Sequence, residues 1–419
     1  MRIRRSCRAA ALAAPAALIL ALLVIAPMDA GAFELWSDET GSRSYDLNAT
    51  VKWTSLLSRA PSDTLLYPVE WSGASLWRLR LGLDSRPHPS VRIDVAYDLR
   101  ARIESDAGGG ALLLPSTLPA PYRIKQLDAD VVDAGEGLSL RHELDRASFN
   151  VAFGSADVTV GRQAVGWGRG LYFSVVDVFA PFSPLESDRE WRRGIDAIRV
   201  RVPLRELSSL DAVYAFGESQ DESAILARIH GYVGNFDGEL VVGERRTEQV
   251  YAASLSVPLF DAEIHGEAGV FLDDERETAA KALVGASRSF DVMAGLYVVA
   301  EYHYSGYGVE DVTDMDSLAD PAFVDRFASG DTQILGRHAV TVQASYGFAG
   351  TVPVSITWLG SPVDGSGVII PALNWSFSDS VTLTAQAYFA HGAGPEDGVI
   401  RSEYGATPAS VVASISFYY

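Results

Sequence analysis

Residues 409–419 read ASVVASISFYY, and this stretch decides the fold. Every second residue from Val411 to Phe417 is apolar, and Ser414 and Ser416 stand between them. A period of two gives a β-strand one apolar face and one polar face. The sequence therefore predicts a half-exposed strand at this end of the chain.

The same alternation recurs along the rest of the chain. Residues 91–104 alternate apolar side chains with arginine and acidic ones, and residues 340–348 and 381–389 alternate them with hydroxyl and amide ones. These runs reach the roughly 10 residues that a tilted strand needs to cross a bilayer, whereas soluble strands average about 5–6. We predict strands at 44–54, 75–84, 91–104, 144–154, 156–165, 194–203, 209–217, 223–233, 236–245, 249–258, 261–272, 280–288, 292–304, 337–348, 352–360, 367–377, 381–391 and 409–419.

The predicted fold is all-β, a transmembrane antiparallel up-and-down barrel of about eighteen strands (16–18). Connections after even-numbered strands are short, but several after odd-numbered strands are long, as expected for periplasmic turns opposite extracellular loops. An even count leaves both chain ends on the periplasmic side. A soluble β-sandwich or solenoid is the alternative, and it does not account for both strand length and loop asymmetry. The long connections are 55–74, 105–143, 166–193, 305–336 and 392–408.

Residues 1–32 have the pattern of a secretory signal peptide. Four arginines precede the apolar run 9–27, and Ala30-Gly31-Ala32 fits a cleavage site. Cys7, the only cysteine, precedes the apolar run, so residues 33–419 contain no disulfide. We predict a signal peptide over 1–32 and a single barrel domain over 33–419, exported to the outer membrane of a Gram-negative cell.

The charge of the chain argues against nucleic acid as a partner. The formal net charge is −20, and residues 1–32 contribute four arginines and one aspartate, so residues 33–419 carry about −23. After the leader, no stretch supplies the roughly 20 apolar residues of a transmembrane helix. A spanning structure must then be a closed barrel, in which every backbone polar group is paired.

The polar face of the N-terminal strands is rich in arginine. In a water-filled lumen, a ladder of guanidinium groups attracts anions and presents paired donors to carboxylate or phosphate. The alternative is that arginines and interspersed aspartates pair across strands and only stabilise the wall. The predicted lumen-lining, solute-binding residues are Arg78, Arg80, Arg92, Arg100, Arg102, Arg199 and Arg201.

The connection 166–193 is predicted to narrow the pore. It combines glycines, aromatic residues and a dense run of charges, and side chains such as Phe173, Val176 and Phe179 need cover from water. Folding inward against the wall supplies this cover; packing outside on other loops or another subunit is the alternative. The predicted constriction residues are Trp167, Arg169, Asp177, Asp188, Arg189, Arg192 and Arg193.

Other chemistry has little support in the sequence. The acidic connection 305–336 could bind Ca²⁺ but lacks the spacing and glycine of an EF-hand loop. Glu263, His265 and Glu267 share a strand face, and a neighbouring pair, Glu301 and His303, lies two strands away. Hydrated lumen charges explain these groups more simply than a metal site. No HExxH, GxSxG, P-loop or CxxC motif occurs, so we predict no enzyme activity, no metal and no cofactor.

The C-terminal stretch resembles the closing strand of bacterial outer-membrane barrels. In that family the barrel-assembly machinery reads an aromatic residue at the C-terminus, usually Phe, where this chain has Tyr419. The resemblance implies that this machinery is a partner, together with outer-membrane lipid. A homo-oligomer is compatible with the sequence.

Residues 156–203 are similar to a segment of the porin-like barrels related to alginate-export channels. The similarity comprises Gly161-Arg162-Gln163, the aromatic and glycine-rich stretch that follows, and a strand opening with Gly194. That family has an eighteen-stranded outer-membrane barrel whose arginine-rich conduit carries an acidic polysaccharide. Trp167-Gly168-Arg169-Gly170, Pro181 and Pro184 depart from its motifs, which puts the substrate in doubt.

The sequence thus predicts an outer-membrane porin for passive passage of solutes, with anions as the expected class, through a lumen lined by arginine and narrowed by the connection 166–193. One alternative is a barrel that scaffolds or exports a polymer or partner protein, recognisable by a lumen closed in isolation. The other is an outer-membrane barrel enzyme, recognisable by an Asp/His or Ser/His pair near the rim.

Overall fold

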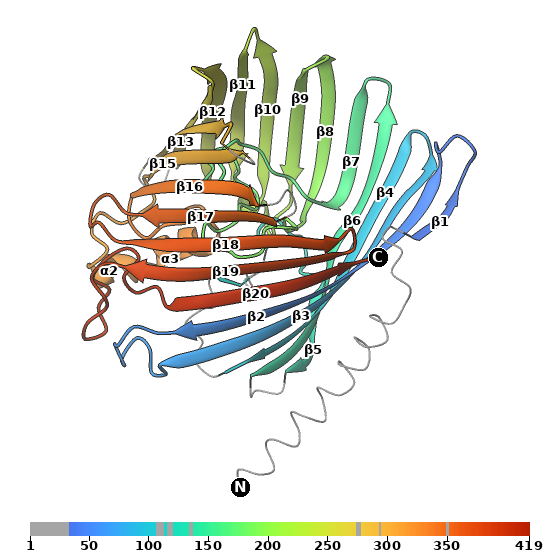
Figure 1. The fold of residues 1–419 in the computed structure, drawn as a ribbon. Coiled ribbons are helices and arrows are strands. Elements are labelled where there is room, and N and C mark those ends of the chain that lie inside the picture. The colour runs from blue at the N-terminus through green and yellow to red at the C-terminus, as the bar shows by residue number, and fades with distance from the viewer. Residues whose placement is uncertain are drawn as a thin grey trace, which may run out of the picture.

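The computed structural model describes residues 33–105, 113–114, 120–133, 137–273, 278–292, 295–348 and 352–419. The predicted signal peptide, residues 1–32, lies outside these ranges. The described strands form one antiparallel sheet that closes on itself (Figure 1).

Eighteen of these strands make the closed barrel, which confirms the predicted fold. Each barrel strand pairs with its neighbours in chain order, and β2 pairs with β20 to complete the ring. The barrel strands are β2 (Ser44–Arg59), β3 (Trp71–His88), β4 (Val91–Glu104), β6 (Leu138–Phe153), β7 (Ala156–Gln163), β8 (Ile195–Arg205), β9 (Ser208–Ala215), β10 (Ala224–Val233), β11 (Phe236–Arg245), β12 (Glu248–Leu259), β13 (Ala262–Asp273), β14 (Ala279–Phe290), β15 (Leu296–Ser305), β16 (His338–Phe348), β17 (Val352–Gly360), β18 (Gly367–Ser378), β19 (Val381–His391) and β20 (Ala409–Tyr418).

Two further strands were not predicted, and each fills a free edge. Strand β1 (Phe33–Ser37) pairs with the first residues of β2, next to the place where the backbone of Tyr419 bonds to Ala49. Strand β5 (Asp128–Asp133) pairs with the start of β6, where the shorter β7 does not reach. Unpaired strand edges expose backbone donors and acceptors, and these short strands satisfy them.

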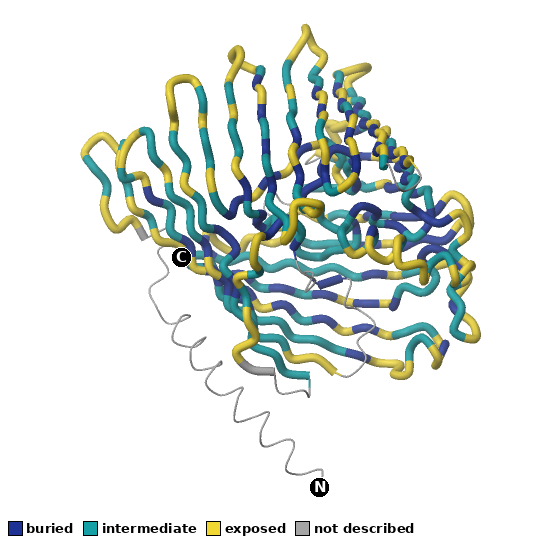
Figure 2. Tube along the Cα trace, turned by 180° about the vertical axis from the view of Figure 1, so that it is seen from behind, coloured by how far each residue is buried: buried dark blue, intermediate teal, exposed yellow. Residues whose placement is uncertain are grey.

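Burial follows the alternation of the sequence (Figure 2). On β11, Leu240 and Val242 are exposed on the outer face, while Glu239 and Val241 are buried on the inner face. The inner face differs from the expected polar wall on one side of the barrel. On β8–β13, the half of the inner face that lies away from the turns at 206–207 and 234–235 is apolar. It belongs to the main hydrophobic cluster, with Ile195, Val213, Leu226, Val241, Val250 and Phe271.

The long connections also carry regular structure. Residues 306–337 contain the helices α2 (Met315–Leu318) and α3 (Pro321–Ala328), and the side chains of Asp314 and Asp320 accept backbone hydrogen bonds at their N-termini. A short 3₁₀ helix, η2 (Gln220–Glu222), lies between β9 and β10. Among the residues that the structure describes, no helix is long and apolar enough to cross a membrane.

The β2–β20 register predicts a specific cross-link. Thr54 lies opposite Ser414, and their hydroxyl oxygens are 3.0 Å apart. Thr54→Cys with Ser414→Cys is expected to form a disulfide on mild oxidation, giving a shifted band on a denaturing gel without reductant. The control is Thr54→Cys with Ser410→Cys, about 13 Å further along the strand. Equal cross-linking of both pairs would contradict the register.

Candidate functional site

The connection between β7 and β8, residues 164–194 and here called the inner loop, lies inside the barrel. Val175, Val176 and Phe179 are fully buried, as expected for apolar side chains that have left water. The ring of Phe179 packs edge-on against Trp167 at 5.1 Å, and Phe173 stacks on His303 of β15 at 4.6 Å. The apolar inner wall of β8–β13 is the surface that receives this loop.

The inner loop touches the wall on opposite sides of the barrel. The indole nitrogen of Trp167 donates to Asp211 on β9 (3.3 Å), and the hydroxyl of Tyr172 bonds to Thr357 on β17 (2.9 Å). Further along, Gln386 on β19 donates to the carbonyl of Ser187, and Lys52 on β2 pairs with Asp188 at 2.9 Å. The loop therefore crosses the lumen near mid-height of the strands.

Two buried carboxylates hold the backbone of this loop. Glu267 on β13 accepts hydrogen bonds from the backbone N–H groups of residues 169, 170, 175 and 176, and from the hydroxyl of Ser174. Glu301 on β15 accepts from the N–H groups of residues 171 and 172 at 2.7 and 3.0 Å. An ionised carboxylate strengthens such hydrogen bonds, and each bond fixes one more part of the loop.

The glycines of Trp167-Gly168-Arg169-Gly170 are required by this geometry. Gly168 has φ +97°, and a Cβ there would lie 2.1 Å from the Ser174 hydroxyl oxygen. A Cβ on Gly170 would lie 1.6 Å from the carbonyl oxygen of Phe173. The glycine-rich segment is thus what lets the backbone wrap around Glu267.

The predicted arginines of β3 and β4 form a paired network. Arg78, Arg80 and Arg100 all bond to Asp98, which is fully buried, and Arg80 also bonds to Asp145 at 2.9 Å. The indole of Trp191 lies 4.5 Å from the guanidinium of Arg78. We call the guanidiniums gathered here the arginine cluster: Arg78, Arg80, Arg100, Arg123, Arg146 and Arg193.

The other predicted wall arginines lie apart from this cluster. Arg92 pairs with Asp84 near the short β3–β4 turn, Arg102 with Glu104, and Arg199 with Asp211. Arg201 is exposed, and no described carboxylate lies within ion-pair distance of it. The structure therefore brings three of the seven predicted wall residues together, and most of the seven are ion-paired.

The predicted arginines of the inner loop also differ in their partners, which are carboxylates for some and backbone carbonyls for others. Arg169 pairs with Asp237 on β11, and Arg192 pairs with Asp177 inside the loop. Arg189 donates to three loop carbonyls, those of residues 171, 183 and 184, so it stabilises the loop itself. Neither Arg189 nor Arg193 has an ion pair with a described residue, and Arg193 lies beside Glu143 and the arginine cluster.

Several residues of the site were not predicted. Lys52, Arg123, Glu143, Asp145, Trp191 and Lys281 contact the loop or the cluster. Asp145 faces inward because the β4–β6 register shifts beside it, which simple alternation does not foresee. Lys281 on β14 donates to the carbonyl of Ser174 in the inner loop and to that of Asp331 in the connection 306–337.

Burial changes the acidity of three groups on the inner loop. It raises the pKa of Asp177 to about 6 and that of Glu186 to about 7, because the ionised forms lose water. Burial also lowers the pKa of Arg193 to about 10, although nearby Glu143 acts in the opposite direction. The charge of the inner loop therefore depends on pH near neutrality.

The carboxylates weighed as metal ligands have other partners. Glu267 and Glu301 hold the inner loop, and His265 bonds to Glu301 at 3.0 Å. In the connection 305–336, Asp314 and Asp320 cap helices, and Asp331 pairs with Arg245 and Arg326. No group of three or more His, Cys, Asp or Glu arranged to hold a metal occurs within the described part of the chain.

Comparison with solved structures finds barrels of similar fold. OccAB1 of Acinetobacter baumannii is 9% identical, with a TM-score of 0.56, over 93% of this chain and 98% of that one. A BenF-like porin from Pseudomonas fluorescens Pf-5 is 10% identical (TM-score 0.55, 89% and 98% covered), and OccK9 (OpdG) of Pseudomonas aeruginosa is 9% identical (0.54, 89% and 98%). No protein-family model and no curated protein matches the chain. At these identities the likeness is one of fold: a closed eighteen-stranded barrel.

Proposed function

We propose that the protein is an outer-membrane channel for passive passage of anionic solutes. The observation that carries this proposal is the inner loop, which crosses the lumen of a closed barrel and is anchored to opposite walls. A loop held in this way narrows the passage and sets its diameter. The porin of similar fold supports the same function at the level of architecture.

The charge next to the inner loop favours anions. The arginine cluster has six guanidiniums, and five described carboxylates interact with it: Asp94, Asp98, Glu143, Asp145 and Glu186. Arg193 has no ion pair with a described carboxylate, although Glu143 lies near it, and we propose that its charge acts on a passing solute. The solute is small or polymeric; an acidic polysaccharide is the finer candidate, suggested by the similarity of residues 156–203 to alginate-export barrels.

The outer surface is consistent with a lipid environment. Exposed apolar side chains lie on successive strands, among them Ile229, Leu240, Leu255 and Val284. Lipid accepts such a face, and the closed sheet leaves no unpaired barrel edge. We propose that the barrel-assembly machinery binds β20, the strand ahead of Tyr419, during insertion.

Removing the charge of Arg193 is expected to reduce anion selectivity. A unit charge about 7 Å from an ion in water contributes about 0.6 kcal/mol, favourable for an anion and unfavourable for a cation, so Arg193→Ala should lower the anion-to-cation permeability ratio about sevenfold. The measurement is the reversal potential of single channels in a planar bilayer under a KCl gradient. Arg205→Ala, at the end of β8, is the control. A cation-selective native channel would contradict the proposal.

Glu267→Gln is expected to loosen the inner loop. The amide loses the charge of the carboxylate and turns an N–H group toward backbone donors, and hydrogen bonds to a charged group contribute about 1.5–3 kcal/mol each. Single-channel recording should show higher conductance and larger current fluctuations. Glu263→Gln is the matched control, since Glu263 lies on the same strand face and accepts only from Ser256. If Glu267→Gln channels have the native conductance and no larger current fluctuations, Glu267 does not anchor the loop.

Anion selectivity is expected to fall as pH rises from about 5 to about 8. Asp177 and Glu186, with raised pKa values, are neutral at the lower pH and become negative across this interval, which lowers the net positive charge at the loop. Reversal potentials measured at several pH values test this. Glu186→Gln should remove the part of the change near pH 7 and leave the part near pH 6. A pH-independent selectivity would show that these groups do not face the ion path.

A further inference from the structure

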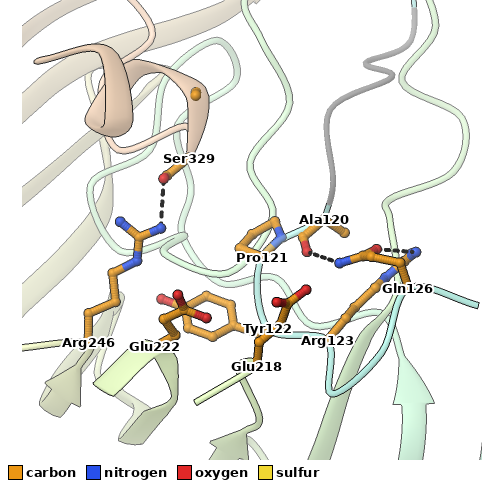
Figure 3. Close-up of a pocket in the computed structure, with 11 residues that line it drawn as sticks. Ala120, Pro121, Tyr122, Arg123, Gln126, Glu218, Glu222, Arg246 and Ser329 are labelled. Atoms are coloured by element: carbon orange, nitrogen blue, oxygen red, sulfur yellow. Dashed lines mark hydrogen bonds between the residues drawn. The ribbon is translucent and has the colours of Figure 1, made fainter. Parts of the chain in front are cut away.

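A separate cavity lies among the loops on the side opposite the short turns (Figure 3). Its volume is about 280 Å³, which is large enough for a small organic molecule. Its walls come from the segment 120–126, from η2 and the residues before it, from the β11–β12 turn, and from the end of α3. None of these residues belongs to the predicted site.

Two arginines and two glutamates line the cavity. Each arginine already pairs with a carboxylate outside the lining. Arg246 pairs with Asp325 at 3.1 Å and donates to the hydroxyl of Ser329. Arg123 pairs with Glu143 at 2.6 Å and donates to the carbonyl of residue 194. Neither guanidinium is therefore an open site for an anion.

The two acidic residues of the lining have no such partner. Glu218 and Glu222 form no ion pair and no side-chain hydrogen bond with any residue that the structure describes, and both are exposed. The C-terminal end of α3, at Ala328 and Ser329, adds the partial negative charge of a helix terminus. The two arginines of the lining are paired with carboxylates outside it, so the uncompensated charge of the cavity is that of Glu218 and Glu222.

An aromatic ring completes the lining. Tyr122 is held by the hydrogen bond from the N–H of Asp196 to its carbonyl and by edge-on contact with Phe179 of the inner loop at 5.8 Å. Figure 3 shows its ring beside Glu218 and Glu222, between Arg246 and Arg123. Carboxylates together with an aromatic ring are the groups that recognise amines, amidines and quaternary ammonium ions.

We propose that this cavity is a binding site for small organic cations at the outer mouth of the barrel. Glu218 and Glu222 bind the charged group, and the ring of Tyr122 contacts the apolar part of the ligand. The site shares Arg123 with the arginine cluster, and it contacts the inner loop through Tyr122 and Phe179.

Calorimetric titration of the detergent-solubilised protein with benzamidinium tests the site. Benzamide, which has the same ring and no charge, should bind at least about tenfold more weakly, a difference of about 1.4 kcal/mol. The double variant Glu218→Gln/Glu222→Gln should lose about the same factor for benzamidinium. Glu206→Gln, an exposed glutamate in the β8–β9 turn, should bind as the native protein does, and native single-channel conductance of each variant shows that the barrel is intact.

Three results would overturn the proposal. They are equal affinity for benzamide and benzamidinium, unchanged benzamidinium binding by the double variant, and no binding of benzamidinium at millimolar concentration. The second result would also place any bound cation elsewhere, for example in the lumen. None of them bears on anion passage, so the two proposals fail independently.

Discussion

The interior depends on one set of hydrogen bonds, those that the carboxylate of Glu267 accepts from backbone N–H groups of the inner loop. A loop of about thirty residues inside a barrel brings many polar backbone groups away from water, and each unpaired one is costly. Glu267 and Glu301 pair six of these groups from only two wall positions. The glycines at 168 and 170 are required by a backbone held in this place.

The ion pairs of the barrel wall stabilise its buried arginines and also fix the charge on which the proposed selectivity depends. Buried guanidiniums need counter-charges, because an unpaired buried ion carries a large desolvation cost. Asp98, Glu143 and Asp145 supply these charges to the arginine cluster, which places the arginines in fixed orientations. The excess of positive charge is small and concentrated at Arg193. Selectivity in the proposed channel would then depend on a few groups rather than on the whole ladder.

Most of the barrel was predictable because strands have a simple period. The ranges 91–104, 236–245, 352–360 and 381–391 agree exactly with the structure. Strands β1 and β5 were missed because both are short and exist only by filling an edge of a longer neighbour. The apolar inner wall was missed as well, since alternation assigns inward positions to water and says nothing of a loop that covers them. The pairing of Arg78 and Arg80 with Asp98 depends on register across strands, and the inward turn of Asp145 on a local shift in that register.

Lys281 connects parts of the chain that are far apart in sequence. Its ammonium group donates to the carbonyl of Ser174, on the inner loop, and to that of Asp331, beside α3. Asp331 in turn pairs with Arg245, the last residue of β11, and with Arg326 of α3. These ion pairs join the connection 306–337 to that end of β11. The connection 306–337 also reaches the inner loop directly, because Gln333 donates to the carbonyl of Phe182 at 2.6 Å. In mechanical terms, these bonds couple the connection 306–337 to the inner loop that crosses the lumen.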